Sequence, residues 1–194
     1  MRSSGSTRSP RHNPSVRLYI ILAGEDHPKL CTGRRLLHRG LAREVRRVEG
    51  ISPAPIVLDP YAADPLGPGD RTIAVRGGIL AVDCSWNRLT ERGRFPGSEP
   101  GEHLRGIRRR LPILIATNPQ HYGRPAQLNT VEALAAALVL VGHPDEGARL
   151  LQGFRGSDAF LKVNAERFAA YILESDADGI RAAERRMFGG DPAD

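Results

Sequence analysis

The stretch AVDCSWNRL, from Ala81 to Leu89, holds the residues of this chain that are best suited to chemistry. An apolar, strand-like run ends there in a carboxylate, a thiol, a hydroxyl and the only tryptophan of the 194 residues. Asp83 could be a catalytic carboxylate, or it could cap a helix that begins near Ser85. Trp86 could stack on a purine or anchor a core. By themselves these residues favour the cap and the anchor, and both alternatives stay open.

Two further groups of side chains could contact nucleic acid. His121 and Tyr122 lie in a loop with Gly and Pro, where an imidazole and an aromatic ring can meet RNA or simply face solvent. Arg105 and Arg108 to Arg110 form a basic cluster that suits either a phosphate backbone or a solvated helix face. The sequence contains no GxGxxG after its first apolar run, no P-loop, no HExxH and no GxSxG. Spacing alone therefore indicates no established catalytic motif.

Four apolar runs indicate the strands that must position these groups. They are Val16 to Gly24, Ala54 to Leu58, Gly78 to Asp83 and Ile113 to Ala116. Apolar runs bounded by Gly, Pro or polar loops are typical of the buried strands of a largely parallel sheet. Because ligands bind beyond the carboxyl ends of such strands, the polar loops after Ala23, Asp83 and Ala116 form the expected site.

Helices are expected after the first strand and over the C-terminal part. Apolar residues at helical spacing predict one helix from the N-cap Thr32 to about Gly50, and residues 90–106 are predicted to form an exposed loop. Asn129, followed three residues later by Glu132, matches a capping box, and further amphipathic helices are predicted over 144–154, 157–175 and 179–188. The chain is thus predicted to be α/β, with an N-terminal mixed, largely parallel sheet completed by a mostly helical C-terminal part.

Composition indicates a basic protein without membrane segments. The formal net charge is +6, and residues up to Glu49 include eleven Lys or Arg against four acids, which suits phosphates or a solvated surface. Residues 1–15 are predicted to be a disordered basic tail. Without a secretory or membrane-spanning run, the protein is expected in the cytoplasm with no membrane partner. Cys31 and Cys84 have no metal-ligand spacing, so they are expected to be reduced thiols and no metal site is predicted.

Four motifs, taken together, resemble one known family. They are DHPKLCTGRRLL (Asp26 to Leu37), VDCSWNRL (Val82 to Leu89), RRLPILIATNPQHYGRPAQLNTVEALAAAL (Arg109 to Leu138) and LLQGFRGSDAFLKVNAERFAAYI (Leu150 to Ile172). They look like the small-subunit (16S/18S) rRNA aminocarboxypropyltransferases, ribosome biogenesis proteins with a fold similar to the knotted SPOUT-type methyltransferases. The resemblance runs from about Val16 to about Phe188. It implies a trefoil knot, which nothing in composition or periodicity would predict.

The resemblance also implies a division into domains. Residues 16–110 would form an N-terminal α/β domain, of which residues 16–50 resemble the N-terminal region of an RNase L inhibitor-type ATPase. Residues 111–188 would form a mostly helical, knotted domain that binds S-adenosylmethionine, and residues 189–194 a tail. The clustered cysteines of an iron–sulfur domain are missing, so no cluster is implied.

The reaction implied by the family is transfer of the 3-amino-3-carboxypropyl group from S-adenosylmethionine to N3 of a (N1-methyl)pseudouridine in small-subunit rRNA, with release of methylthioadenosine. Asp83 matches the acidic position of the DCSW motif, either as the general base for the attacking nitrogen or as a group that positions the substrate. Two departures from the family pattern are Gly67-Pro68 in place of a Ser-Pro pair and the small Ala126. The residues implied to hold the cofactor are Thr32, Leu58, Pro60, Val82, Asp83, Trp86, Leu111, Ala126, Leu128 and Thr130.

The same resemblance makes small-subunit rRNA or a pre-ribosomal particle the expected partner of a monomeric protein. Basic side chains would then hold the RNA backbone. These are Arg34, Arg35, Arg39, Arg43, Arg46, Arg105, Arg108 and Arg109. Two other functions stay open: a SPOUT-type rRNA methyltransferase that uses the same pocket, and a non-catalytic assembly factor that binds pre-rRNA through its arginines.

Overall fold

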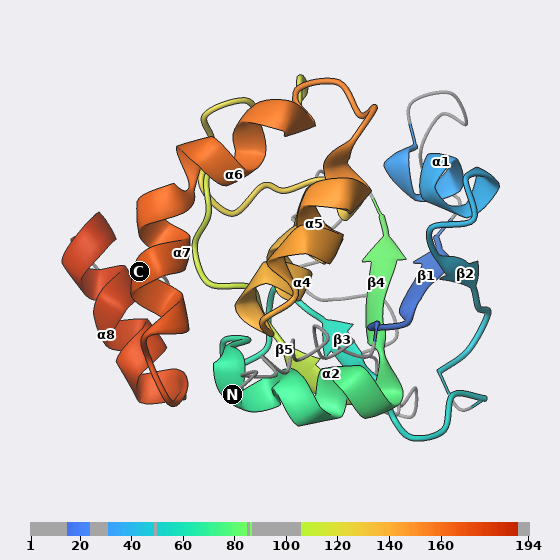
Figure 1. Cartoon of the computed structure of the whole chain (residues 1–194), viewed down its shortest axis with the longest axis horizontal. Helices are drawn as coiled ribbons and strands as arrows, with labels where there is room; N and C mark the ends of the chain where they lie inside the picture. The colour runs from blue at the N-terminus through green and yellow to red at the C-terminus, as the bar shows by residue number, and fades with distance from the viewer. Residues whose placement is uncertain (1–14, 24–30, 49, 85, 87–105, 190–194) are drawn as a thin grey trace, which may run out of the picture.

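A computed structural model describes residues 15–23, 31–48, 50–84, 86 and 106–189. The predicted tails and the predicted loop over 90–106 lie almost entirely outside these residues, as does Arg105. Over the described part of the chain the protein is α/β, with a parallel sheet and helices packed on it, as the sequence predicts (Figure 1).

Five strands form the sheet in the order β2-β1-β4-β3-β5, and every neighbouring pair is parallel. The strands are β1 (Leu18–Leu22), β2 (Arg43–Glu44), β3 (Ile56–Leu58), β4 (Ile79–Asp83) and β5 (Ile107–Arg109). In the register, Leu22 lies opposite Asp83, and Leu58 lies opposite Ala81. The carboxyl ends of β1, β3 and β4 therefore meet at one edge of the sheet, and the predicted loops after Ala23 and Asp83 lie largely outside the described residues.

Both faces of the central strands are apolar because both are covered. Ile79 and Ala81 of β4 belong to the main hydrophobic core, whereas Leu80 and Val82 face a smaller cluster on the other side of the sheet with Tyr19. This alternation follows from the period of two in a strand. It also fixes the direction of Asp83, which continues the row of Ile79 and Ala81.

The helices are α1 (Thr32–His38), α2 (Arg71–Gly77), α4 (Thr130–Leu140), α5 (Pro144–Leu151), α6 (Phe160–Val163), α7 (Ala165–Ile172) and α8 (Ala177–Phe188). Figure 1 shows α4 and α5 in front of the sheet, α1 beside β1 and β2 on the right, and α7 and α8 together on the left. Helix α4 packs on both β4 and α5, which explains why its sequence is apolar nearly all round. The predicted capping box of Asn129 and Glu132 is confirmed.

The prediction of one helix from Thr32 to about Gly50 is wrong. Helix α1 ends at His38, and the backbone N–H groups of Gly40 and Leu41 bond the carbonyls of Leu37 and Leu36, the Schellman pattern of a helix end. Gly40 has φ +67°, a conformation that glycine adopts without strain. The chain then pairs with β1 as strand β2. The apolar residues beyond Gly40 therefore pack along the sheet and not along a helix.

The predicted strand from Ile113 to Ala116 is also wrong in its pairing. Among the described residues this stretch joins no strand of the sheet; it makes an isolated antiparallel bridge between Ile115 and Pro125, with backbone bonds to residues 123–126. The edge strand is instead β5, just before it. Buried side chains satisfy the backbone that a neighbouring strand would otherwise bond: Ile113 N–H donates to Glu184, Ile115 N–H to Asn164 and Thr117 N–H to Glu132.

Asn164 also divides the helix that was predicted over 157–175. Its side-chain amide donates to the carbonyls of Ile115 and Phe160, at 2.9 and 3.0 Å, and is fully buried. The segment therefore folds as a 3-10 turn (Ser157–Ala159), α6 and α7. One core cluster contains both Ile79 of the sheet and Leu134 of α4, so the described parts of 16–110 and 111–188 share their apolar interior. The domain boundary near residue 110 stays a prediction.

Replacing Glu184 with alanine tests how strongly the extended segment is held. Glu184 is fully buried, pairs with Arg110 through two bonds of 2.7 Å and accepts from Ile113. Because the change leaves both donors without their acceptor, the free energy of unfolding is expected to fall by about 3 kcal/mol or more. Urea denaturation followed by circular dichroism measures the loss.

The matched control is Arg186→Ala, which breaks the ion pair of Arg186 with Glu174 at the surface. The Arg186 side chain is 63% exposed, so its removal should change the free energy of unfolding by less than about 1 kcal/mol. Equal losses for the two variants would contradict the structural role of Glu184.

Candidate active site

Asp83 is the buried carboxylate at the carboxyl end of the central strand. It is only 7% exposed, and its carbonyl accepts from the backbone N–H of Ala23, just beyond β1. The side chain lies against the first turn of α1: a Cβ atom on Gly33 would stand 2.7 Å from the Asp83 Cγ. Only glycine leaves room for the carboxylate at this point. Strand β4 and helix α1 thus position Asp83 together.

Two neutral donors hold the Asp83 carboxylate. The Cys31 thiol donates to Oδ2 at 2.6 Å, and the Thr130 hydroxyl donates to Oδ1. Cys31 is the N-cap of α1 and Thr130 is the first residue of α4, so the carboxylate joins the starts of two helices. Helix starts carry partial positive charge, which favours an anion between them. The predicted N-cap, Thr32, is instead the first residue of α1.

Burial keeps the Cys31 thiol a donor. Desolvation, followed by its hydrogen bond to Asp83, raises the pKa of Cys31 from 9.0 to about 12. At neutral pH the sulfur therefore retains its proton and is a poor nucleophile. We assign Cys31 to holding Asp83 and not to covalent chemistry.

Trp86 connects the end of β4 to the loop before α4. Its indole Nε1–H donates to the carbonyl of Leu128 at 2.7 Å, and its ring packs with the smaller apolar cluster behind the sheet. Leu128 itself is buried in the main core. The structure therefore brings together four predicted site residues in two bonded pairs, Asp83 with Thr130 and Trp86 with Leu128. Thr32 lies next to this site in the chain, directly after Cys31.

The remaining predicted cofactor residues occupy different positions. Leu58 is buried at the end of β3, and Pro60 follows it at the surface. The Val82 side chain faces the smaller cluster, on the opposite side of the sheet from Asp83. Leu111 is half-buried against the main core. Ala126 is exposed and has φ +60°, while its N–H donates to the carbonyl of Leu114.

Glu132 fixes the loop that carries Leu128 and Thr130. This fully buried carboxylate accepts from the Thr117 N–H and hydroxyl at 2.8 Å each, and from the Asn118 side chain at 2.7 Å. It also accepts from the Asn129 N–H at 3.1 Å. All of these donors are neutral. The capping-box spacing identified Glu132 as a helix residue but gave no sign that it also binds the loop after Ala116.

The arginines that were predicted to bind RNA fall into separate groups. Arg108 pairs with the buried Asp59, and Arg109 bonds Asp70 at 3.1 Å, so these two guanidiniums tie β5 to the segments around it. Arg35 and Arg39 bond carbonyls of the segment between α5 and α6. The others in the described part of the chain, Arg34, Arg43 and Arg46, are exposed. They do not form one continuous stripe with Arg108 and Arg109.

Two other kinds of feature, a metal site and a membrane-spanning helix, are absent from the described residues. In that part of the chain no three His, Cys, Asp or Glu side chains are grouped so as to hold a metal ion. Nor does any helix found there have the length and apolar character needed to cross a membrane. His121 is half-buried, while Tyr122 is 72% exposed on the loop after Ala116.

Comparison with known proteins places this arrangement in a class. Residues 56–188 match the family model described as "Ribosome biogenesis protein, C-terminal". The 16S rRNA aminocarboxypropyltransferase of Vulcanisaeta distributa is 36% identical over 184 residues, covering 92% of this chain and 91% of that protein. That of Methanopyrus kandleri is 37% identical over 173 residues, covering 86% and 96%. The 18S rRNA aminocarboxypropyltransferase of Schizosaccharomyces pombe is 36% identical over 84% of this chain and 54% of its own length.

A solved structure is similar over the same extent. The S-adenosylmethionine-dependent rRNA aminocarboxypropyltransferase Tsr3 from Vulcanisaeta distributa aligns with a TM-score of 0.78 at 36% identity, covering 92% of each chain. The chain belongs to the rRNA aminocarboxypropyltransferase family of ribosome biogenesis proteins.

The change Glu132→Gln is expected to loosen the loop that Trp86 contacts. An amide offers one acceptor atom where Glu132 offers two, so at least one buried donor loses its partner, at a cost of about 2 kcal/mol. Because Trp86 is the only tryptophan, its emission reports on this loop directly. We expect the emission to shift to longer wavelength and the affinity for S-adenosylmethionine to fall.

Glu184→Gln is the matched control, since it makes the same change at another fully buried carboxylate. It should lower stability without moving the Trp86 emission. If the two variants shift the emission equally, Glu132 does not position this loop in particular.

Proposed function

We propose that this protein transfers the 3-amino-3-carboxypropyl group of S-adenosylmethionine to small-subunit rRNA during ribosome biogenesis. The observation that carries the proposal is the Asp83 carboxylate, held by Cys31 and Thr130 at the carboxyl edge of a parallel sheet. Its motif is one of those that resemble this family, and relatives with this activity match nearly the whole chain. The family supplies the reaction, and the site supplies a carboxylate at the expected position.

The residues present suit S-adenosylmethionine. Leu58, Trp86 and Leu128 are apolar groups beside the carboxyl edge of the sheet and can wall an adenine or a methyl group. The capping box uses the N–H groups of Asn129 and Glu132. The first turn of a helix has N–H groups without an intrahelical acceptor, so those at Thr130 and Val131 can bind the carboxylate of the aminocarboxypropyl arm.

Positioning decides which carbon is transferred. When bound, S-adenosylmethionine supplies a sulfonium that activates three carbons towards a nucleophile. We assign Leu58, Pro60 and Trp86 to holding the methyl side in apolar surroundings, and Thr32 and Thr130 to holding the arm. Fixing one carbon in line with the acceptor favours it over the others by several kcal/mol, through orientation alone. We assign Val82, Leu111 and Ala126 to contacts with the cofactor through their backbone groups.

Asp83 takes the proton from the attacking imide nitrogen. Each carboxylate oxygen has two lone pairs, so the bonds from Cys31 and Thr130 leave acceptor capacity for that proton. The same two bonds fix the direction of the carboxylate, which a positioned base requires. The acceptor is N3 of a (N1-methyl)pseudouridine, an assignment supported by the resemblance of the motifs.

The knot, the domains and the oligomeric state of the protein are also proposed from the resemblance of the motifs. The C-terminal part closes a SPOUT-like trefoil knot. The protein has two domains, residues 16–110 and residues 111–188. The protein acts as a monomer in the cytoplasm on rRNA or a pre-ribosomal particle. The exposed Arg34, Arg43 and Arg46 attract the RNA backbone, an effect that weakens with salt.

Labelled S-adenosylmethionine tests the reaction. The protein is incubated with a small-subunit rRNA hairpin that carries N1-methylpseudouridine and with cofactor labelled in either the carboxyl carbon or the methyl group. We expect only the carboxyl label to enter RNA. Entry of the methyl label alone would make the protein a methyltransferase, and entry of neither label with RNA still bound would favour an assembly factor.

Asp83→Asn tests the base. The amide keeps the shape of the carboxylate but cannot take up the proton, so single-turnover transfer is expected to slow by about 100-fold or more. The dissociation constant for S-adenosylmethionine, measured by calorimetry, should change by less than about threefold. A loss of cofactor affinity that accounts for the whole loss of rate would make Asp83 a positioning group.

A further inference from the structure

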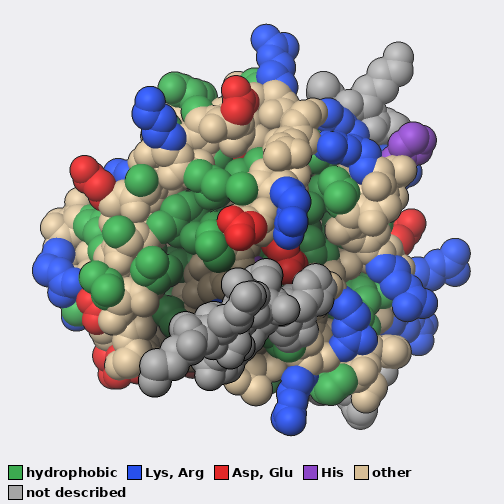
Figure 2. Space-filling view, viewed as in Figure 1, with side chains coloured by type: hydrophobic (Ala, Val, Ile, Leu, Met, Phe, Trp, Pro, Cys, Tyr) green, Lys and Arg blue, Asp and Glu red, His purple; other side chains and the backbone are tan. Residues whose placement is uncertain are grey.

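A surface groove lies between α1 and the connection from α5 to α6. Its volume is about 700 Å³, and its lining includes Arg35 from α1 and Leu151, Phe154, Arg155 and Leu161 from the connection and its flanking helices. The groove thus has apolar side chains along its length and arginines from both sides. Figure 2 shows Lys and Arg side chains gathered at the upper right, over α1 and next to this connection.

Arg35 of α1 and Arg39, the residue that follows α1, are fixed on the ring of Phe154. The guanidinium carbons of Arg35 and Arg39 stand 4.6 and 5.0 Å from the ring centroid. Arg35 also donates to the Gly153 carbonyl at 3.0 Å, and Arg39 to the Gln152 carbonyl at 2.7 Å. Each guanidinium has five N–H donors, so these contacts fix its orientation and leave donors for a ligand.

The groove adjoins the site around Asp83 through both of its walls. On one side, the N–H of Arg35 bonds the carbonyl of Cys31, the residue whose thiol holds Asp83. On the other, a Cβ atom on Gly156 would stand 2.5 Å from the Thr117 carbonyl, so the connection packs directly on the segment that Glu132 binds. The groove is therefore built on the same helix and the same loop segment that hold the site around Asp83.

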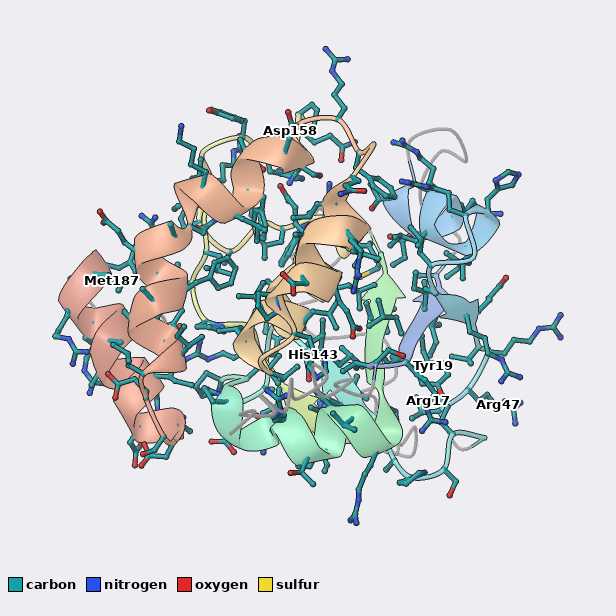
Figure 3. All side chains as sticks on the ribbon, viewed as in Figure 1. Arg17, Tyr19, Arg47, His143, Asp158 and Met187 are labelled. Carbon is teal, nitrogen blue, oxygen red and sulfur yellow. The ribbon has the colours of Figure 1, made fainter. Side chains whose placement is uncertain are left out.

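Two polar groups of the groove have no partner within the part of the chain that the structure describes. The Ser157 hydroxyl is fully buried and makes no hydrogen bond there. Arg155 is exposed and forms no ion pair with any described residue. Asp158 is the single carboxylate among the lining residues, and it lies where the connection meets α6 (Figure 3). The lining contains two arginines and one carboxylate, and this net positive charge favours an anionic ligand.

We propose that this groove holds the sugar-phosphate backbone of substrate rRNA next to the reacting nucleotide. Arg35 and Arg155 contact phosphates, because a guanidinium can bond two phosphate oxygens at once. The apolar floor takes the face of a base or ribose from a single-stranded segment. The proposal rests on the proposed function for its RNA, and it assigns phosphate contacts to Arg155, which was not among the arginines that the sequence predicted to bind RNA. Arg108 and Arg109, paired with Asp59 and Asp70, are not part of it.

The charge reversal Arg155→Glu tests the groove, with Arg185→Glu on α8 as the matched control. Both arginines are exposed, and neither forms an ion pair with a described residue. Binding of a fluorescein-labelled small-subunit rRNA hairpin is measured by anisotropy at two salt concentrations, and S-adenosylmethionine binding by calorimetry. We expect Arg155→Glu to weaken RNA binding about tenfold or more and to reduce the salt dependence by about one phosphate contact. Arg185→Glu should change the affinity by less than about twofold, and neither variant should alter cofactor binding.

Asp158→Asn is a second test, in which the RNA affinity is expected to rise and not to fall. Removing the carboxylate from the groove should tighten RNA binding about twofold to threefold, and this gain cannot come from misfolding. Equal RNA affinities for Arg155→Glu and Arg185→Glu would overturn the proposal. If Arg155→Glu loses binding to poly-glutamate but binds RNA as the wild type does, the proposal is also overturned, and the groove is assigned to an acidic peptide.

These outcomes are separate from failure of the proposed function. If the wild-type protein transfers no carboxyl label but loses RNA affinity through Arg155→Glu, the groove is an RNA site and the reaction is wrong. If it transfers the label and Arg155→Glu binds RNA normally, the reaction stands and the groove assignment fails.

Discussion

The extended segment from Ile113 to Thr117 is the constraint on which both fold and site depend. Its alternate N–H groups cannot be bonded by a neighbouring strand and are accepted by Glu184, Asn164 and Glu132, side chains that are all fully buried. These side chains belong to α8, the junction of α6 and α7, and α4. A buried backbone group without a partner is costly, so the segment and the helices that bond it must fold together.

The same network reaches the Asp83 carboxylate. Glu132 bonds both the end of this segment and the residue before Thr130, and the Thr130 hydroxyl bonds Asp83. Stability and site geometry are therefore held by one set of contacts. Every donor to the Glu132 carboxylate is neutral, so the arrangement relies on geometry and not on ion pairing. Such a network specifies one loop conformation because each missing bond leaves a buried polar atom unsatisfied.

The basic character of the chain divides into two kinds of arginine. Arg108, Arg109 and Arg110 pair with Asp59, Asp70 and Glu184, so their charges serve the packing of β5 and its surroundings. Arginines over α1 and the connection to α6 keep donors directed at solvent. Net charge is the sum of both kinds, which is why a count of +6 cannot by itself locate a nucleic-acid surface.

Local patterns in the sequence determined the central strands, the capping box at Asn129 and the carboxyl edge where Asp83 lies, because these depend on apolar runs and near neighbours. The helical spacing from Leu37 to Val48 led to the wrong prediction of one long helix, because the spacing continues past Gly40, whose left-handed turn ends α1. Only the tertiary structure placed Cys31 against Asp83, 52 residues away, and Glu132 against Thr117. No local periodicity records which distant donor meets a buried carboxylate, because that pairing is set by how the helices pack on the sheet.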